Sequence, residues 1–176
     1  MEIELRARLT NGPRFLKSIR RNKRAVHVGS SVEDDLYLRH LSDASRKLVL
    51  RIRRRGSSSI LTFKGKAKHA DTAWPDVDLP LEHPDELEHL LLASDYVHVV
   101  RILKRRWTFR FNGLELNIDQ VRKLGWFVEL EARGTEKQRP KLESKIERTL
   151  ADFGIHSTAI VRQGYVPLAI AREQGQ

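Results

Sequence analysis

The chain has 176 residues, of which 40% are hydrophobic and 32% charged, and this length fits one soluble domain, residues 1–176, with a single core. It has no cysteine, which excludes disulfides and thiolate metal sites, and neither a signal peptide nor the roughly 20 apolar residues that cross a bilayer, so we expect a cytoplasmic protein. The net charge of +10 indicates a polyanionic partner, either nucleic acid, an anionic membrane surface or a phosphate-rich small molecule.

Most of the first 134 residues alternate between apolar and polar side chains, which predicts about eight antiparallel strands. The expected strand segments are residues 1–9, 25–31, 35–40, 45–53, 60–66, 74–79, 97–111, 114–121 and 126–133. Helical spacing of apolar residues predicts helices at 15–21, 83–93 and 135–153. A last helix is expected at 158–172, although it contains Gly164 and Pro167.

The polar face of these strands is strongly charged. The first strand places Glu2, Glu4 and Arg6 on one side, opposite three apolar residues. The same alternation gives three further groups that each share a face: Arg51 with Arg53, Lys64 with Lys66, and Glu129 with Glu131. Like charges two residues apart repel one another unless a ligand of opposite charge compensates them. Solvated strand faces are the simpler reading of any one pair, but the whole set favours a closed barrel that is polar inside.

Asn112-Gly113 is the strongest hairpin signal in the chain. If these are the two turn residues, three polar pairs lie opposite one another: Arg110 with Glu115, Thr108 with Asn117, and Arg106 with Asp119. The basic and acidic residues of this hairpin would then form one face.

A face with both kinds of charge can bind divalent cations and phosphate groups. Clustered carboxylates suit a hard cation such as Mg²⁺ or Mn²⁺, which prefers oxygen ligands. Clustered arginine and lysine suit phosphate oxygens, and arginine can bind them in a bidentate manner. Carboxylate-held metal beside a cationic cluster is a usual arrangement for phosphoryl chemistry.

Several segments resemble the signatures of the CYTH superfamily, the triphosphate tunnel metalloenzymes. Glu2-Ile3-Glu4-Leu5-Arg6 is similar to its Glu-x-Glu-x-Lys motif, and residues 119–131 are similar to its Asp-x-Val-x-x-Leu-Gly-x-Phe-x-Glu-x-Glu segment. Residues 35–38, 50–53, 61–64 and 104–106 resemble further family segments, in the family's order along the chain. The short N-terminal segment Met1-Glu2-Ile3-Glu4 and the later segment Gln163-Gly164-Tyr165-Val166 look most like the class IV adenylyl cyclase (CyaB-type) branch.

The resemblance implies an α+β fold with a closed eight-stranded antiparallel barrel, helices packed outside it, and bound magnesium or manganese. The expected metal ligands are Glu2, Glu4, Asp119, Glu129 and Glu131. The expected triphosphate-binding residues are Arg51, Arg53, Lys64, Lys66, Lys104 and Arg106. The expected catalytic cations are Arg6, Lys104 and Arg106. Arg6 stands where the family has lysine, and Trp74 replaces a family arginine.

The leading hypothesis is an adenylyl cyclase that converts ATP to cyclic AMP and pyrophosphate. The alternative of the same fold is a triphosphatase that hydrolyses inorganic triphosphate or thiamine triphosphate. A non-catalytic module that binds polyphosphate or nucleic acid is the second alternative, with 18–24 and 53–55 as its basic runs. Paired carboxylates argue against nucleic acid as the partner, and a homodimer is compatible with the sequence. We expect Glu131→Ala and Arg53→Ala to abolish activity without unfolding the protein.

Overall fold

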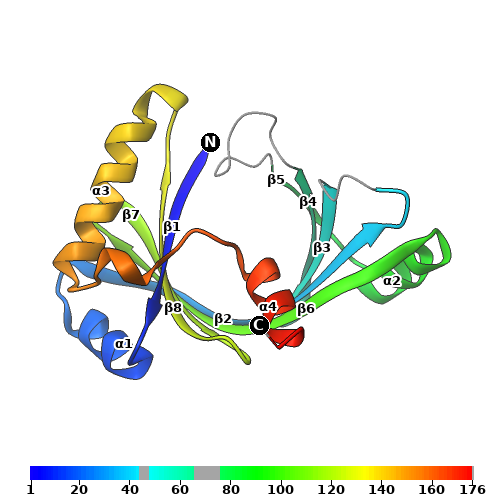
Figure 1. Ribbon diagram of the computed structural model, residues 1–176, viewed down its shortest axis with the longest axis horizontal. Helices are drawn as coiled ribbons and strands as arrows, with labels where there is room; N and C mark the ends of the chain where they lie inside the picture. The colour runs from blue at the N-terminus through cyan, green and yellow to red at the C-terminus, as the bar shows by residue number, and fades with distance from the viewer. Residues whose placement is uncertain (44–47, 66–75, 176) are drawn as a thin grey trace. The chain divides into compact units, whose positions relative to one another are not determined.

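A computed structural model describes residues 1–43, 48–65 and 76–175, and it has an α+β fold (Figure 1). Its strands hydrogen-bond in the order β5-β4-β3-β2-β6-β7-β8-β1-β9. The chain divides into two compact units: unit 1 comprises Met1–Ser31 and Lys104–Gln176, and unit 2 comprises Val32–Leu103. Within the described ranges, no helix is long and apolar enough to span a membrane.

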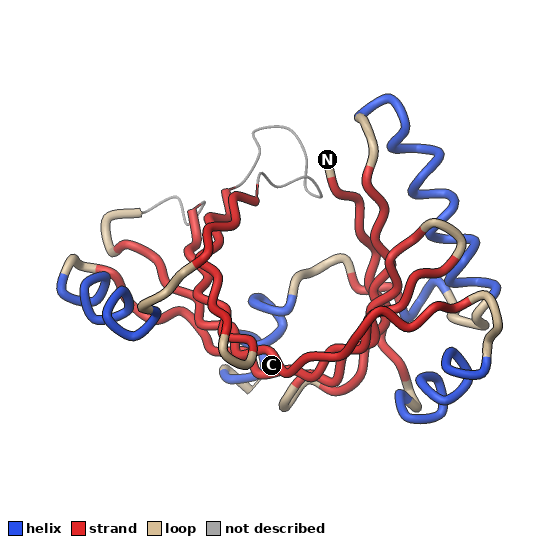
Figure 2. Tube along the Cα trace, turned by 180° about the vertical axis from the view of Figure 1, so that it is seen from behind, coloured by secondary structure: helices blue, strands red, loops and turns tan. Residues whose placement is uncertain are grey.

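Unit 1 is built on a sheet whose apolar side packs against two helices. The strands that lie wholly in this unit are β1 (Glu2–Leu9), β7 (Leu114–Val121), β8 (Gly125–Arg133) and the short β9 (Ile160–Val161). Strand β8 pairs antiparallel with both β1 and β7, and β9 pairs antiparallel with the other edge of β1. Helices α1 (Gly12–Arg21) and α3 (Arg139–Asp152) lie on one side of these strands (Figure 2). The core between them includes Ile3, Leu5, Leu16, Ile19, Leu116, Ile118, Leu130, Ile146 and Leu150.

Unit 2 has a smaller core. Strands β3 (Leu48–Arg55), β4 (Ser58–Gly65) and β5 (Asp76–Pro80) form an antiparallel meander. Helix α2 (Pro84–Ala93) packs Leu87 and Leu91 against Leu36, Leu38 and Ile52. The long strands β2 (Ala25–His40) and β6 (Tyr96–Phe111) each contribute residues to both units.

The element predictions are largely confirmed, with two differences. The two short strands expected at 25–31 and 35–40 are one continuous strand, β2. The last predicted helix is instead a 3-10 turn (Ser157–Ala159), the short strand β9 and helix α4 (Tyr165–Glu173). Gly164 precedes α4 in extended backbone, and Pro167 lies in its first turn, where proline is tolerated.

The predicted barrel is confirmed only as an antiparallel sheet. The described strands number nine rather than eight because β9 adds to the edge of β1. Their order is linear, with β5 and β9 at its two ends, so the described pairings do not close the sheet. The register of the 106–119 hairpin is confirmed: Arg110 pairs with Glu115, and Arg106 with Asp119.

Close packing at the start of α1 explains why residue 12 is a glycine. A Cβ atom there would lie 2.1 Å from Cδ2 of Trp126, whose ring stacks on Trp107 with centroids 5.4 Å apart. We expect Gly12→Ala to lower the free energy of unfolding by about 1–3 kcal/mol because the stacked rings must shift. Urea unfolding measures this, with Gly29→Ala as the matched control, since no atom lies within 4 Å of its added Cβ. Equal stability of both variants would contradict the packing explanation.

Candidate active site

Most charged side chains of the unit 1 strands lie on the side of the sheet that faces away from α1 and α3. Alternation along β1 and β8 puts Ile3 and Leu130 in the core and the intervening charged residues on the opposite face. The register then places Arg6 opposite Glu129 and Glu4 opposite Glu131. Local strand periodicity therefore creates the cluster, and strand pairing sets its neighbours.

Two arginines and two buried carboxylates form the centre of this face. Arg106 makes a bidentate pair with Asp119, with Nε–Oδ1 at 2.8 Å and Nη2–Oδ2 at 2.6 Å, and its Nη2 also lies 2.9 Å from Glu129 Oε1. Arg6 donates to the other oxygen of Glu129. Asp119 is 0% and Glu129 3% exposed, so both carboxylates depend on the arginines for charge compensation.

These pairings fix the protonation states at the centre. Burial alone would raise the pKa of Glu129, but the guanidinium groups of Arg6 and Arg106 outweigh burial and hold that pKa well below its usual value. Burial likewise opposes the charge of Arg6, but Glu129, Tyr165 and Glu4 raise the pKa of Arg6 above its ordinary value. Arg6 is therefore a permanent cation, and it cannot act as a general base.

Tyr165, the first residue of α4, closes over this centre. Its hydroxyl donates to Asp119 Oδ2 at 2.9 Å, and its ring lies 4.1 Å from Arg6 Cζ and 5.5 Å from Lys104 Nζ. Arg6 Nη1 also donates to the Gln163 carbonyl at 3.0 Å. Burial and the charge of Asp119 raise the pKa of Tyr165 well above its usual value, so the hydroxyl remains a donor. The segment that follows β9 thus orients the two basic side chains.

Three carboxylates at the end of the same face lie close enough to share a cation. Glu2, Glu4 and Glu131 each offer an oxygen, and these oxygens all lie within 4.8 Å of one another. The side chains of Glu2 and Glu4 are 47% and 42% exposed, whereas that of Glu131 is 14% exposed. The group is therefore open to solvent on the β1 side and enclosed at Glu131.

Glu131 occupies an unfavourable position for a charged carboxylate. Burial, followed by the negative charge of Glu129, raises its pKa from the ordinary 4.5 to about 10, although Arg106 acts in the opposite direction. Asn117 donates to Glu131 Oε1 at 3.0 Å, but it supplies no charge. This carboxylate is short of positive charge, which a divalent cation would provide.

A pH-dependent stability follows from this shift in metal-free protein. Because the folded state holds a proton on Glu131 that the unfolded carboxyl releases near its ordinary pKa of 4.5, the contribution of this group to stability falls as pH rises from about 4.5 towards 10. Glutamine does not titrate, so Glu131→Gln should raise Tm relative to the wild type more at pH 8 than at pH 5. Thermal unfolding in EDTA measures this difference. Glu147→Gln, at an exposed site on α3, is the control, and an equal pH response in both variants would contradict the prediction.

Unit 2 carries a second cluster on the polar face of β2 and β3. Arg53 makes a bidentate pair with Asp35, with Nε–Oδ1 at 2.6 Å and Nη2–Oδ2 at 2.7 Å. Its Nη2 also lies 3.3 Å from Glu33 Oε2. Glu33 and Asp35 are 0% and 1% exposed, and Arg55 also pairs with Glu33. Burial opposes the charge of Arg53, but its bonds to Asp35 keep its pKa raised. The expectation that Arg53→Ala leaves the fold intact is therefore revised, because truncation would remove the bidentate partner of the buried Asp35 and one of the two arginines that pair with the buried Glu33.

Arg51 lies beside this pair with an unused donor. Its Nη2 donates to Thr62 Oγ1 at 2.9 Å, and Thr62 in turn donates to Asp78 Oδ1 at 2.6 Å. Its Nε is buried and has no hydrogen-bond partner among the described residues. A buried donor without an acceptor costs about 1–3 kcal/mol, so an incoming anion would gain this bond.

The structure sorts the predicted site residues into three groups. Glu2, Glu4 and Glu131 form the carboxylate group; Arg6, Lys104, Arg106, Asp119 and Glu129 lie at the unit 1 centre; Arg51 and Arg53 lie in unit 2. Lys64 is on β4, opposite Asp76, but its side chain is not described. Lys66 and Trp74 lie outside the described residues.

Sequence reasoning did not assign site positions to Glu33, Asp35, Thr62, Asn117 and Tyr165. The signal for Asp35 and Thr62 was available, because Asp35 is in register with Arg53 and Thr62 with Arg51. Tyr165 could not be found in this way. It reaches Asp119 across 46 positions of sequence, through a helix that follows the sheet.

Known proteins resemble this chain along almost its whole length. A model of the CYTH domain matches residues 1–165. A Methanocaldococcus jannaschii protein named "Putative adenylate cyclase" is 20% identical over 172 residues, which are 96% of this chain and 98% of that protein. The PH1819 structure from Pyrococcus horikoshii has a TM-score of 0.82 at 21% identity, covering 98% of this chain and 99% of its own.

A plant structure has a similar fold. Hippeastrum HpAC1, described as a "putative adenylyl cyclase" that reveals a dominant triphosphatase activity, has a TM-score of 0.70 at 18% identity, covering 98% of this chain and 95% of its own. At such identities the solved structures establish the fold alone. The family model, however, spans almost the whole chain and includes the charged segments described above. The chain belongs to the CYTH domain family.

Proposed function

We propose that the protein is a divalent-metal-dependent enzyme that acts on a triphosphate compound. The observation that carries this proposal is the carboxylate group of Glu2, Glu4 and Glu131 beside two arginines, with Arg106 Nη1 3.7 Å from Glu131 and Arg6 Nη2 3.4 Å from Glu4. A metal site and phosphate-binding cations are thus combined on one face of unit 1. Family membership supports the same class of substrate.

The residues fit magnesium or manganese. All three donors are carboxylate oxygens, which hard divalent cations prefer, and Glu4 and Glu131 are directly opposed in register, where like charges repel. The raised pKa of Glu131 also fits a carboxylate that a bound divalent cation would stabilise in its charged form. When bound, the metal would lower the pKa of an attacking hydroxyl and neutralise charge on the phosphate oxygens. The roles of Asp119 and Glu129 are then to hold Arg106 and Arg6.

Each unit carries basic side chains that would bind phosphate oxygens. In unit 1, Arg106, Lys104 and Arg6 would stabilise the negative charge that develops on these oxygens. In unit 2, Arg51 would bind a phosphate oxygen through its unused Nε, and Arg53 is assigned the same class of ligand. Lys64 and Lys66 remain predicted phosphate ligands, and closure of the strands into a barrel remains a prediction.

We assign cyclisation of ATP to cyclic AMP and pyrophosphate as the first activity. The M. jannaschii relative, which this chain matches over 98% of that protein's length, is named "Putative adenylate cyclase". Hydrolysis of a triphosphate is the second candidate, since the related Hippeastrum protein is described by its triphosphatase activity. Both reactions use the same cations and metal. They differ in the attacking group, which is the ribose 3′-hydroxyl in one and water in the other.

A single assay separates these activities. Purified protein is incubated with Mg²⁺ or Mn²⁺ and with ATP, tripolyphosphate or thiamine triphosphate, and the products are resolved by chromatography. Cyclic AMP with equimolar pyrophosphate supports the cyclase, and orthophosphate without cyclic AMP supports the triphosphatase. If no substrate turns over with either metal, the proposed enzymatic function is wrong, and the non-catalytic binding module is favoured.

A further inference from the structure

The outward face of α1 carries a dense set of cations that the proposed active site does not use. No aspartate or glutamate occurs between Leu5 and Val32, whereas this segment contains eight arginines and lysines. The exposed basic residues in or just after α1 are Arg14, Lys17, Arg20, Arg21, Lys23 and Arg24. We call these six residues the α1 basic face.

Most of this face has no partner within the described ranges. Arg24 donates to Asn112 Oδ1 at 2.9 Å, but the side chains of Arg14, Lys17, Arg20 and Arg21 make no hydrogen bond or ion pair with a described residue. The basic run 53–55 is different, because Arg54 pairs with Asp85 and Glu88, and its two neighbours pair with buried carboxylates of β2. Of the two basic runs noted in the sequence, only that on α1 presents uncompensated charge.

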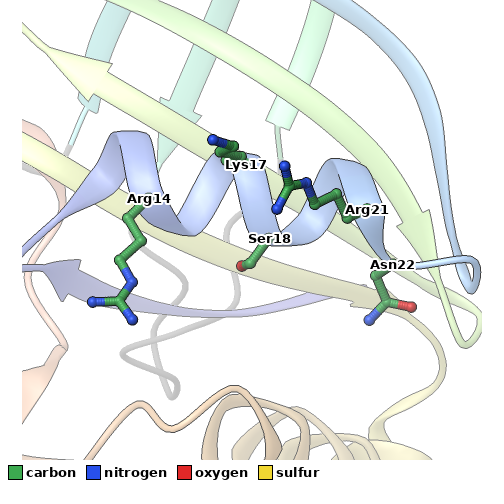
Figure 3. A pocket seen from close by; sticks show the side chains of 5 residues that line it. All are labelled: Arg14, Lys17, Ser18, Arg21 and Asn22. Carbon is green, nitrogen blue, oxygen red and sulfur yellow. The ribbon is translucent and has the colours of Figure 1, made fainter.

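The unpaired side chains border a shallow hollow of about 550 Å³. Arg14, Lys17, Ser18, Arg21 and Asn22 line it, as the close view along α1 shows (Figure 3). Arg14, Lys17 and Arg21 follow the i, i+3, i+7 spacing of one helix face, so they extend over about 10 Å of helix axis. Asn22 adds a neutral amide donor, which also binds phosphate oxygens, whereas the Ser18 hydroxyl already donates to the Phe15 carbonyl at 2.7 Å.

We propose that the α1 basic face binds the phosphodiester backbone of a nucleic acid, independently of base sequence. The spacing supports this occupant, since phosphates along one strand recur about every 3.4 Å of helix axis and about three fit along this row. No aromatic side chain is exposed on α1 for stacking on bases, which indicates backbone contacts only. The carboxylates that disfavour nucleic acid lie on the strands, whereas α1 contains no aspartate or glutamate.

Two other polyanionic surfaces fit less well. A helix that binds in a membrane interface inserts an apolar face, but the apolar residues Leu16 and Ile19 of α1 are 7% and 1% exposed in the unit 1 core. An acidic protein would need an apolar centre for a stable interface, and the outward residues of α1 are basic or polar.

The test is fluorescence anisotropy with a labelled 20-base-pair double-stranded DNA in EDTA, at salt concentrations from 50 to 200 mM. The triple variant Arg14→Gln/Lys17→Gln/Arg21→Gln should weaken binding at least about tenfold at 50 mM salt and reduce the slope of log K against log salt by about 3. A control of equal charge change, Lys137→Gln/Lys141→Gln/Arg148→Gln, alters exposed residues in or just before α3 and should bind nearly as the wild type does. Triphosphate turnover should be the same in both variants, so the proposal stands or fails separately from the enzymatic function.

Four results would overturn the inference. Equal loss of DNA binding in both triple variants would show a response to net charge rather than to α1. Displacement of DNA by tripolyphosphate at equal phosphate concentration would indicate a small-anion site. Stronger, α1-dependent binding to vesicles containing phosphatidylserine would identify a membrane surface, and loss of turnover in the α1 variant with an unchanged Tm would place α1 in the catalytic site.

Discussion

Replacing Glu131 with glutamine is expected to lower kcat/KM for the triphosphate by about 10³-fold, measured at the metal concentration that saturates the wild-type protein. The variant keeps the size of the side chain and its bond from Asn117, but it removes the most enclosed ligand of the carboxylate group. A metal contribution of several kcal/mol corresponds to this factor, since each 1.4 kcal/mol changes the rate tenfold. Steady-state kinetics over a range of Mn²⁺ concentrations measures the effect.

Loss of turnover must be accompanied by loss of metal binding and not by unfolding. Calorimetric titration with Mn²⁺ should show weaker binding by Glu131→Gln, while its Tm in EDTA at pH 8 stays at or above that of the wild type. Glu147→Gln, at an exposed position of α3, should retain both turnover and metal affinity. A fully active Glu131→Gln protein with wild-type Mn²⁺ affinity would remove Glu131 from the metal site.

Replacing Arg53 with alanine is expected to destabilise the protein by about 3–5 kcal/mol, in addition to any effect on activity. The substitution leaves Glu33 and Asp35 buried without their shared cation, and a broken buried ion pair costs about this amount. For a chain of this length, the corresponding fall in Tm is about 10 °C. Thermal and urea unfolding at pH 7 measure the change.

A neighbouring pair supplies a matched control. Arg101 makes a similar bidentate contact with Asp34, at 2.7 and 2.5 Å, but its side chain is 58% exposed. Arg101→Ala should therefore cost no more than about 1 kcal/mol, as exposed ion pairs usually do. Adding Asp35→Asn to Arg53→Ala should recover part of the lost stability, and a loss no larger than that of Arg101→Ala would contradict the buried-pair explanation.

The local pattern of the sequence was sufficient to predict the strands and the residues on their polar face. Alternation in residues 2–9 and 114–133 identified which side chains share a face, because the strand repeat of two is a property of the backbone alone. Asn112-Gly113 also fixed the pairing of Arg106 with Asp119, since a two-residue turn leaves one register. Periodicity was misleading beyond residue 157, where the apolar spacing is interrupted by Gly164 and Pro167 and the chain forms β9 before α4.

The sequence by itself determined most of the elements, the charged face and the family, because these depend on short-range periodicity and on motifs in a fixed order. Only the tertiary structure decided how the five expected metal ligands divide. Asp119 and Glu129 became partners of arginines because cross-strand neighbours and Tyr165 surround them, whereas Glu2, Glu4 and Glu131 lie where their oxygens converge. Burial and long-range contacts set that division, since Arg6 and Arg106 outweigh burial and lower the pKa of Glu129, whereas burial and the charge of Glu129 outweigh Arg106 and raise the pKa of Glu131.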